Sequence, residues 1–224
     1  MTPEQAERLE AEALRIYRRY QKEVVEALSL CPWAEKASAD GNVRIAISLD
    51  DADAAVDATV EALAADAAVH VGLILLPLSE RGRKEHERFV AETRERHAAS
   101  HGGTPPMAMA AFHFDAEANL ETPARLVPFV RRTPDPTIQL VRLTVLEELR
   151  APFDTGTGYV DLSRKSILEL LASPPKKPLH ERIAHHNHET ITAMGPEAFA
   201  AKVEAIRRDR DESYARILGY GRPR

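Results

Sequence analysis

The chain has 224 residues, 44% of them hydrophobic and 29% charged, which is an ordinary composition for a globular protein with a full core. Its net charge of −5 and pI near 6.0 leave no basic surplus to neutralise a phosphate backbone, so nucleic acid is excluded as a main partner. The longest apolar runs fall well short of the roughly 20 residues that span a bilayer, and the charged N-terminus lacks the apolar core of a secretory signal. With a single cysteine, these features predict a cytoplasmic protein that has no membrane contact.

The first half of the chain predicts alternating helices and strands. Thr2 and Pro3 begin a helix whose apolar residues recur at helical spacing as far as Leu28, and Pro32 ends it. The next expected elements are a strand at 43–48, a helix at 50–66, a buried strand at 69–78, a charged helix at 81–100 and a strand at 107–115. This β-α-β-α-β order predicts right-handed crossovers and a small, mainly parallel sheet flanked by helices.

The second half is expected to be mainly helical from about residue 134. Thr133 caps a predicted helix whose apolar face is formed by Ile138, Val141, Val145 and Leu149. A glycine-bearing loop or short strand at 151–161 is followed by predicted helices at 163–173, 178–194 and 196–218, with Gly195 placed as a C-cap. We interpret residues 1–224 as one α/β domain, with its sheet core at about 43–115 and a helical part at about 134–218.

The block LCPWA holds the only cysteine, Cys31. A thiol at a helix end serves in some proteins as a redox group or nucleophile, its thiolate stabilised by backbone N–H groups. In Cys-Pro-aromatic redox motifs, however, the cysteine follows a strand and opens a helix, whereas Cys31 follows a long helix and Ala34 stands at the second cysteine position. Cys31 is therefore a candidate catalytic or ligand-contacting residue, and packing beside Trp33 is the alternative.

The block RRTPDPT predicts a site for an anion. Arg131 and Arg132 directly precede the predicted helix, and a helix N-terminus with neighbouring guanidinium groups favours phosphate or carboxylate. In a helix, Asp135, Gln139 and Arg142 would share one face. The candidate ligand-binding residues are Arg131, Arg132, Thr133, Asp135, Thr137 and Arg142. The alternative is a rigid helix entry, fixed by two prolines, with solvated arginines.

His113 lies late in the third predicted strand. Ligands of open α/β sheets bind at the carboxyl ends of strands, where a histidine can act as a general base. His113 is therefore a second candidate catalytic residue. The alternative is a histidine at the strand end that is hydrogen-bonded to the backbone.

The stretch 179–190 is rich in histidine but does not contain the His-Glu-x-x-His motif, because Ala184 stands where the second histidine is required. Glu181, His185 and His188 do share one face of the predicted helix and form the candidate metal triplet, with solvated histidines as the alternative. We expect no metal here. No cofactor is specified by the sequence, which also lacks a standard nucleotide-binding loop.

Four stretches carry a family resemblance: LSLCPWAEKASADGNVRIAIS, AAFHFD, RRTPDPTIQLVR and IAHHNHETITAMG. In their order and spacing, over roughly residues 15–200, the chain resembles the uncharacterised bacterial family called domain of unknown function 1415. The resemblance adds weight to Cys31, His113, Arg132, Thr133, Pro134, Pro136, Thr137 and Arg142. The chain departs from the family pattern at Phe114 and Gln139, where the family has proline and histidine, and His185, His186 and His188 have no counterpart in it. The resemblance implies no known reaction.

The two most specific blocks, LCPWA and RRTPDPT, lie far apart in the sequence. Our leading hypothesis is that they meet with His113 at the carboxyl edge of the sheet and form an enzyme-like or binding pocket for a small anionic molecule. The rival hypothesis is a structural or protein-interaction module in which the same blocks are rigid packing corners. The sequence does not decide between enzyme and non-enzyme and predicts no oligomeric state.

Overall fold

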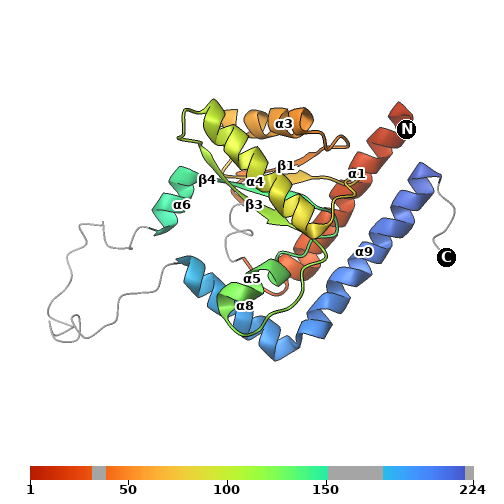
Figure 1. Ribbon diagram of the computed structural model, residues 1–224. Helices are drawn as coiled ribbons and strands as arrows, with labels where there is room; N and C mark the ends of the chain where they lie inside the picture. Colours follow the sequence, from red (N-terminus) through yellow and green to blue (C-terminus); the bar gives the residue numbers. More distant parts are fainter. Residues whose placement is uncertain (32–38, 151–178, 220–224) are drawn as a thin grey trace.

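The computed structural model describes residues 1–31, 39–150 and 179–219. Within these ranges a four-stranded sheet lies between two layers of helices, so the protein is an α/β protein (Figure 1). The predicted loop at 151–161 and helix at 163–173 lie outside the described residues, as do Pro32 and Trp33 of the LCPWA block. None of the described helices combines the length and the apolar character that a membrane span needs.

The N-terminal helix α1 (Pro3–Tyr20) begins as predicted. The hydroxyl of Thr2 accepts a hydrogen bond from the Gln5 backbone N–H, and the Gln5 side chain accepts one from the Thr2 N–H. The predicted single helix in fact changes type, because Gln21–Glu26 form a π-helical segment, η1. A turn in which Ser29 has a positive φ of 49° then leads to Cys31.

The sheet is mixed, so the prediction of a mainly parallel sheet was wrong. Its strands are β1 (Val43–Ile47), β2 (Val71–Leu75), β3 (Met107–Phe112) and β4 (Thr137–Arg142), in the order β1-β2-β4-β3. β1 and β2 pair in parallel, whereas β4 is antiparallel to both of its neighbours. β4 was predicted as part of a helix, and its insertion between β2 and β3 replaces the expected parallel pair with two antiparallel ones.

Each face of the sheet is covered by its own helices. On one face, Ile74 and Leu140 pack with Val60 of α3 (Asp53–Ala65) and Phe89 of α4 (Arg83–Ser100). On the other face, Leu73 and Leu75 pack with residues of α1, α5 (Pro123–Val130), α8 (Leu179–Met194) and α9 (Pro196–Leu218). The long helix α9 runs beside α1 (Figure 1).

The helices of the second half agree only in part with the prediction. α8 and α9 are confirmed, and Gly195 lies between them with a φ of 90°. α6 (Leu143–Arg150) is the second half of the helix predicted from residue 134, so the helical part begins about ten residues later than expected. The helix α5 was not predicted.

The strand directions bring distant segments to one edge of the sheet. β1, β2 and β3 run the same way and β4 runs against them. The segments that follow β2 and β3 therefore meet the segment that precedes β4. We call the edge of the sheet at which these segments meet the carboxyl edge. It is the edge at which ligands bind in open α/β sheets.

Candidate functional site

The RRTPDPT block does not begin a helix. Residues 133–136 form a loop that leads directly into β4, so the predicted helix N-terminus, and with it the physical reason for an anion site there, is removed. The hydroxyls of Thr133 and Thr137 both donate to the backbone carbonyl of Asp135, at 2.7 and 2.9 Å. Both hydroxyls are buried, and they hold the shape of the loop.

The carboxylate of Asp135 is the centre of a buried network. Only 3% of Asp135 is exposed, and its carboxylate accepts hydrogen bonds from Nε of Arg210 and from the hydroxyl of Tyr214, each at 2.8 Å. Burial raises the pKa of Asp135, while Arg210 and Tyr214 oppose that shift by stabilising the charged form. Because both donors lie on α9, the network ties this helix to the loop before β4.

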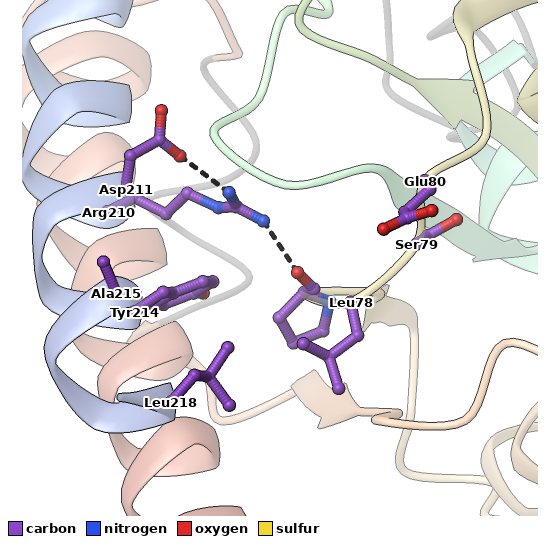
Figure 2. A pocket seen from close by; sticks show the side chains of 9 residues that line it. Leu78, Ser79, Glu80, Arg210, Asp211, Tyr214, Ala215 and Leu218 are labelled. Atoms are coloured by element: carbon purple, nitrogen blue, oxygen red, sulfur yellow. Dashed lines mark hydrogen bonds and ion pairs between the residues drawn. The ribbon is translucent and has the colours of Figure 1, made fainter. Parts of the chain in front are cut away.

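A cavity of about 310 Å³ opens beside this network, between α9 and the segment that follows β2. Figure 2 shows Ser79 and Glu80 facing Arg210 and Tyr214 across it. The guanidinium of Arg210 is fully used, since it also donates to the carbonyl of Pro77 and to Asp211, at 2.7 Å each (Figure 2). Asp211 is paired with Arg210, so the free charge among the lining residues is the carboxylate of Glu80, and the cavity is poorly suited to an anion.

His113 lies just after β3 and is almost fully buried. Its Nδ1 accepts a hydrogen bond from the backbone N–H of Asp115 at 3.2 Å, and its Nε2–H donates to the carbonyl of Arg81 at 3.1 Å. Burial lowers the pKa of His113, which favours the neutral ring. Both ring nitrogens are engaged by backbone groups, so neither is free to move a proton in this arrangement.

Three arginines surround the end of β3. Arg132 donates from Nε to the carbonyl of Phe114, and the guanidinium of Arg207 lies 3.7 Å from the centre of the Phe114 ring. Arg207 reaches the carboxylates of Asp115 and Glu204 only at 3.9 and 4.0 Å. Arg131 lies 5.4 Å from the ring centre of Phe112 and forms no hydrogen bond or ion pair with its side chain among the described residues. Burial lowers the pKa of both Arg131 and Arg132.

Arg142 lies away from the other candidates. It is the last residue of β4, about 17 Å along the strand from Thr137, and thus at the opposite edge of the sheet. Its guanidinium donates to the carbonyls of Val69, Ala64 and Asp66, the last two at the end of α3. Arg142 therefore completes the hydrogen bonds of a helix end, and the expectation that it meets Arg132 and Thr133 in one pocket was wrong.

Cys31 follows the turn after η1 and is partly exposed. It lies close to Tyr17 of α1, whose pKa is raised chiefly by burial and further by the proximity of Cys31. Its catalytic role stays a prediction, because the rest of the LCPWA block lies outside the described residues.

The candidate metal triplet on α8 does not come together. His188 is hydrogen-bonded through Nε2 to the carbonyl of Leu120 at 2.9 Å. Among the residues that the structure describes, the possible ligand atoms of Glu61, His97 and His101 lie within 4.8 Å of one another, and those of Glu181, His185 and His188 do not.

The residues that sequence reasoning missed are Arg207, Arg210 and Tyr214 of α9. Arg210 and Tyr214 are one helical turn apart, so they share a face of the predicted helix. That spacing is the only signal the sequence offers, because their partner Asp135 is 75 residues away from Arg210.

A family model described as "Protein of unknown function (DUF1415)" matches residues 12–159. The match includes Cys31, His113 and the RRTPDPT block and ends before α8 and α9. Comparisons with curated proteins and with solved structures gave no match.

Proposed function

The chain belongs to the DUF1415 family, whose function is unknown, and on this premise we propose that it binds a small anionic molecule beside the end of β3, with Arg131 as the principal contact. The ligand class is an oxyanion, either a carboxylate or a phosphate. The proposed ligand is the one that the leading hypothesis expected. Its binding no longer depends on a helix N-terminus, because no helix begins at residue 133.

The observation that carries the proposal is the state of the Arg131 guanidinium. It is partly buried, burial lowers its pKa, and no described carboxylate or carbonyl accepts a hydrogen bond from it. Taking a guanidinium out of water without a partner is unfavourable, and buried arginines are normally paired. Arg210, which is also largely buried, shows the usual solution, since two carboxylates and a carbonyl accept hydrogen bonds from its guanidinium. An oxyanion would do the same for Arg131, and the guanidinium fork suits it.

The neighbouring charges support the same ligand. Arg132 and Arg207 lie around Phe114, two residues beyond the Phe112 ring that Arg131 contacts. No described carboxylate lies within hydrogen-bonding distance of either guanidinium. Arg132 and Arg207 act on each other at this strand end, and the nearby carboxylates of Asp115 and Glu204 offset part of their charge. We assign no chemical step, since both nitrogens of His113 are already engaged.

A second role, for the RRTPDPT block itself, is supported by the contacts of Asp135. This loop is held by two threonine hydroxyls, and its carboxylate fastens α9 through Arg210 and Tyr214. We infer that residues 133–137 act as a rigid packing corner, as the rival hypothesis expected for this block. The two roles use different residues and are compatible.

The anion proposal is tested with Arg131→Met and the control Arg125→Met, which removes a 60% exposed arginine from α5, the helix that Arg131 directly follows. Inorganic phosphate and succinate are titrated in a buffer of constant ionic strength while the melting temperature is recorded. Either anion should raise the melting temperature of the wild type and of Arg125→Met, and neither should raise that of Arg131→Met. An undiminished shift in Arg131→Met, or no shift in the wild type with both anions, would show that the proposal is wrong.

A further inference from the structure

A second polar cluster lies on the outer layer formed by α3 and α4, which pack side by side on one face of the sheet (Figure 1). Glu61 belongs to α3, His97 lies in the last turn of α4, and His101 directly follows that helix. Because α4 starts at the carboxyl edge, its end lies toward the opposite edge, away from Arg131. One nitrogen of each histidine and one carboxylate oxygen lie within 4.8 Å of one another.

The hydrogen bonds of His101 prepare one of its nitrogens to bind a cation. Its Nδ1 lies 3.0 Å from the backbone carbonyl of His97 and 3.0 Å from the hydroxyl oxygen of Ser100. The carbonyl can only accept, and the Ser100 hydroxyl has acceptors of its own in Glu61 and in that same carbonyl, so we place the proton of His101 on Nδ1. Nε2 then presents its lone pair to the carboxylate of Glu61, whose Oε2 lies 3.6 Å away. A lone pair that faces a carboxylate is unfavourable unless a positive charge lies between them. An N–H to backbone carbonyl bond behind the ligating nitrogen is also the usual support of a metal-bound histidine.

His97 can take the same role. Its Nδ1 lies 2.7 Å from Oε1 of Glu61, and its Nε2 is buried with no hydrogen-bond partner. No buried partner of Nε2 therefore fixes the position of the ring proton of His97. Only the hydrogen bond to Glu61 favours Nδ1 as the protonated nitrogen. A metal ion between His97 and Glu61 would replace that bond, and the ring proton of His97 would then sit on the buried Nε2, which has no acceptor among the described residues.

The distances are close to those of a tetrahedral site. With metal–ligand bonds of about 2.1 Å, two ligand atoms are separated by roughly 3.4 Å. Nε2 of His101 already lies 3.6 Å from Oε2 of Glu61, whereas Nδ1 of His97 lies 2.7 Å from the other oxygen, Oε1. The carboxylate therefore has to turn and move away from His97 before one oxygen can share a metal ion with both histidines. The Glu61 side chain is 42% exposed and can make that movement, and the exposure leaves the fourth position to water.

We propose that Glu61, His97 and His101 form a binding site for one transition-metal ion of the zinc class. Two imidazoles and one carboxylate suit Zn²⁺, Ni²⁺ or Co²⁺, whereas Mg²⁺ and Ca²⁺ require a shell of oxygen ligands. The inference is independent of the anion site, since it uses other residues on the other face of the sheet.

The test is a calorimetric titration of the untagged full chain with Zn²⁺. The wild type should bind one equivalent with a micromolar dissociation constant and should not bind Mg²⁺. His101→Asn and Glu61→Gln should each weaken Zn²⁺ binding at least about tenfold, because the loss of even an outer partner of a ligand costs about that much. Both side chains are partly exposed, so these variants keep the fold, whereas the buried His97 is left intact.

The matched control is His186→Asn, which removes an exposed histidine of the histidine-rich helix α8 and should leave Zn²⁺ binding unchanged. In a spectrum of the histidine side chains, Zn²⁺ should shift the ring signals of His97 and His101. The inference is overturned by the absence of Zn²⁺ binding, by full binding in His101→Asn, or by binding that is lost in His186→Asn.

Discussion

His86 should make the stability of the protein depend strongly on pH between pH 7 and pH 5. Its ring is fully buried between α4 and the sheet, with Nε2 hydrogen-bonded to the carbonyl of Thr137. Burial lowers the pKa of His86 from 6.5 to about 4. The bond to Thr137 opposes the shift, and the nearby charges of His113 and Arg81 add to it. The folded protein therefore keeps this ring neutral where the unfolded chain has already taken up a proton.

The size of the effect follows from the two pKa values. Because the folded-state pKa is the lower one, the unfolded state gains protons first, and stability is lost as the pH falls from about 6.5 toward 4. Between pH 7 and pH 5 the loss from this one group is about 2 kcal/mol. Most carboxylates titrate below this window, and His113, whose pKa burial also lowers, acts in the same direction.

The assay is urea unfolding of the wild type and of His86→Leu at pH 7 and pH 5. The variant has its own cost at both pH values, which cancels in the comparison. The contribution of His113 cancels only in part, because its ring contacts that of His86. The wild type should lose about 2 kcal/mol more than the variant between the two pH values. Equal losses would refute the reasoning. So would a histidine signal of folded His86 that titrates with a midpoint near 6.5, a measurement that needs no variant.

Two further predictions concern the packing of the carboxyl edge and the opposite edge. Tyr214→Phe leaves one oxygen of the buried Asp135 carboxylate without its donor and should lower the unfolding free energy by about 1–3 kcal/mol. Tyr20→Phe, which changes another buried tyrosine and leaves both donors of Asp135 in place, should cost less in the same denaturation experiment. Arg142→Met removes three hydrogen bonds to backbone carbonyls and should destabilise by roughly 1–3 kcal/mol while leaving the phosphate-induced rise in melting temperature intact. If phosphate no longer raised the melting temperature of Arg142→Met, Arg142 would belong to the anion site and this prediction would be wrong.

The alternation of helices and strands up to residue 115 was predictable because each element carries its own periodicity and caps. The helix at 83–100 and the strands at 43–47 and 71–75 are examples. The prediction of a helix at residues 137–142 was wrong for a local reason. Thr133 followed by proline resembles a helix start, and Ile138, Val141 and Val145 fit a helical period. The same six residues, TIQLVR, also alternate between polar and apolar and are rich in β-branched side chains, which favours a strand. Pairing with β2 and β3 decides between the two.

The candidate site was predictable in part. Arg131 and Arg132 were identified, but for a helix dipole that does not exist at that position. Arg142 was grouped with them because a helix would have placed it on the same face as Asp135, whereas a strand carries it to the far edge. The contacts that give Asp135 its role come from α9, and no local pattern predicts which residues of a distant helix will reach a loop. The same holds for Glu61 and His97, which meet only through the packing of α3 on α4.

The most direct test of the anion site is the unfolding free energy of the wild type and of Arg131→Met, each without oxyanions and with saturating phosphate. Without phosphate the variant should be at least as stable as the wild type, because it removes a desolvated guanidinium charge that only the face of the Phe112 ring opposes, at 5.4 Å. Phosphate should then stabilise the wild type alone, so that the order of the two proteins reverses. If Arg131→Met is less stable by more than about 1 kcal/mol under both conditions, and phosphate acts equally on both proteins, Arg131 is a structural residue and the central claim is contradicted.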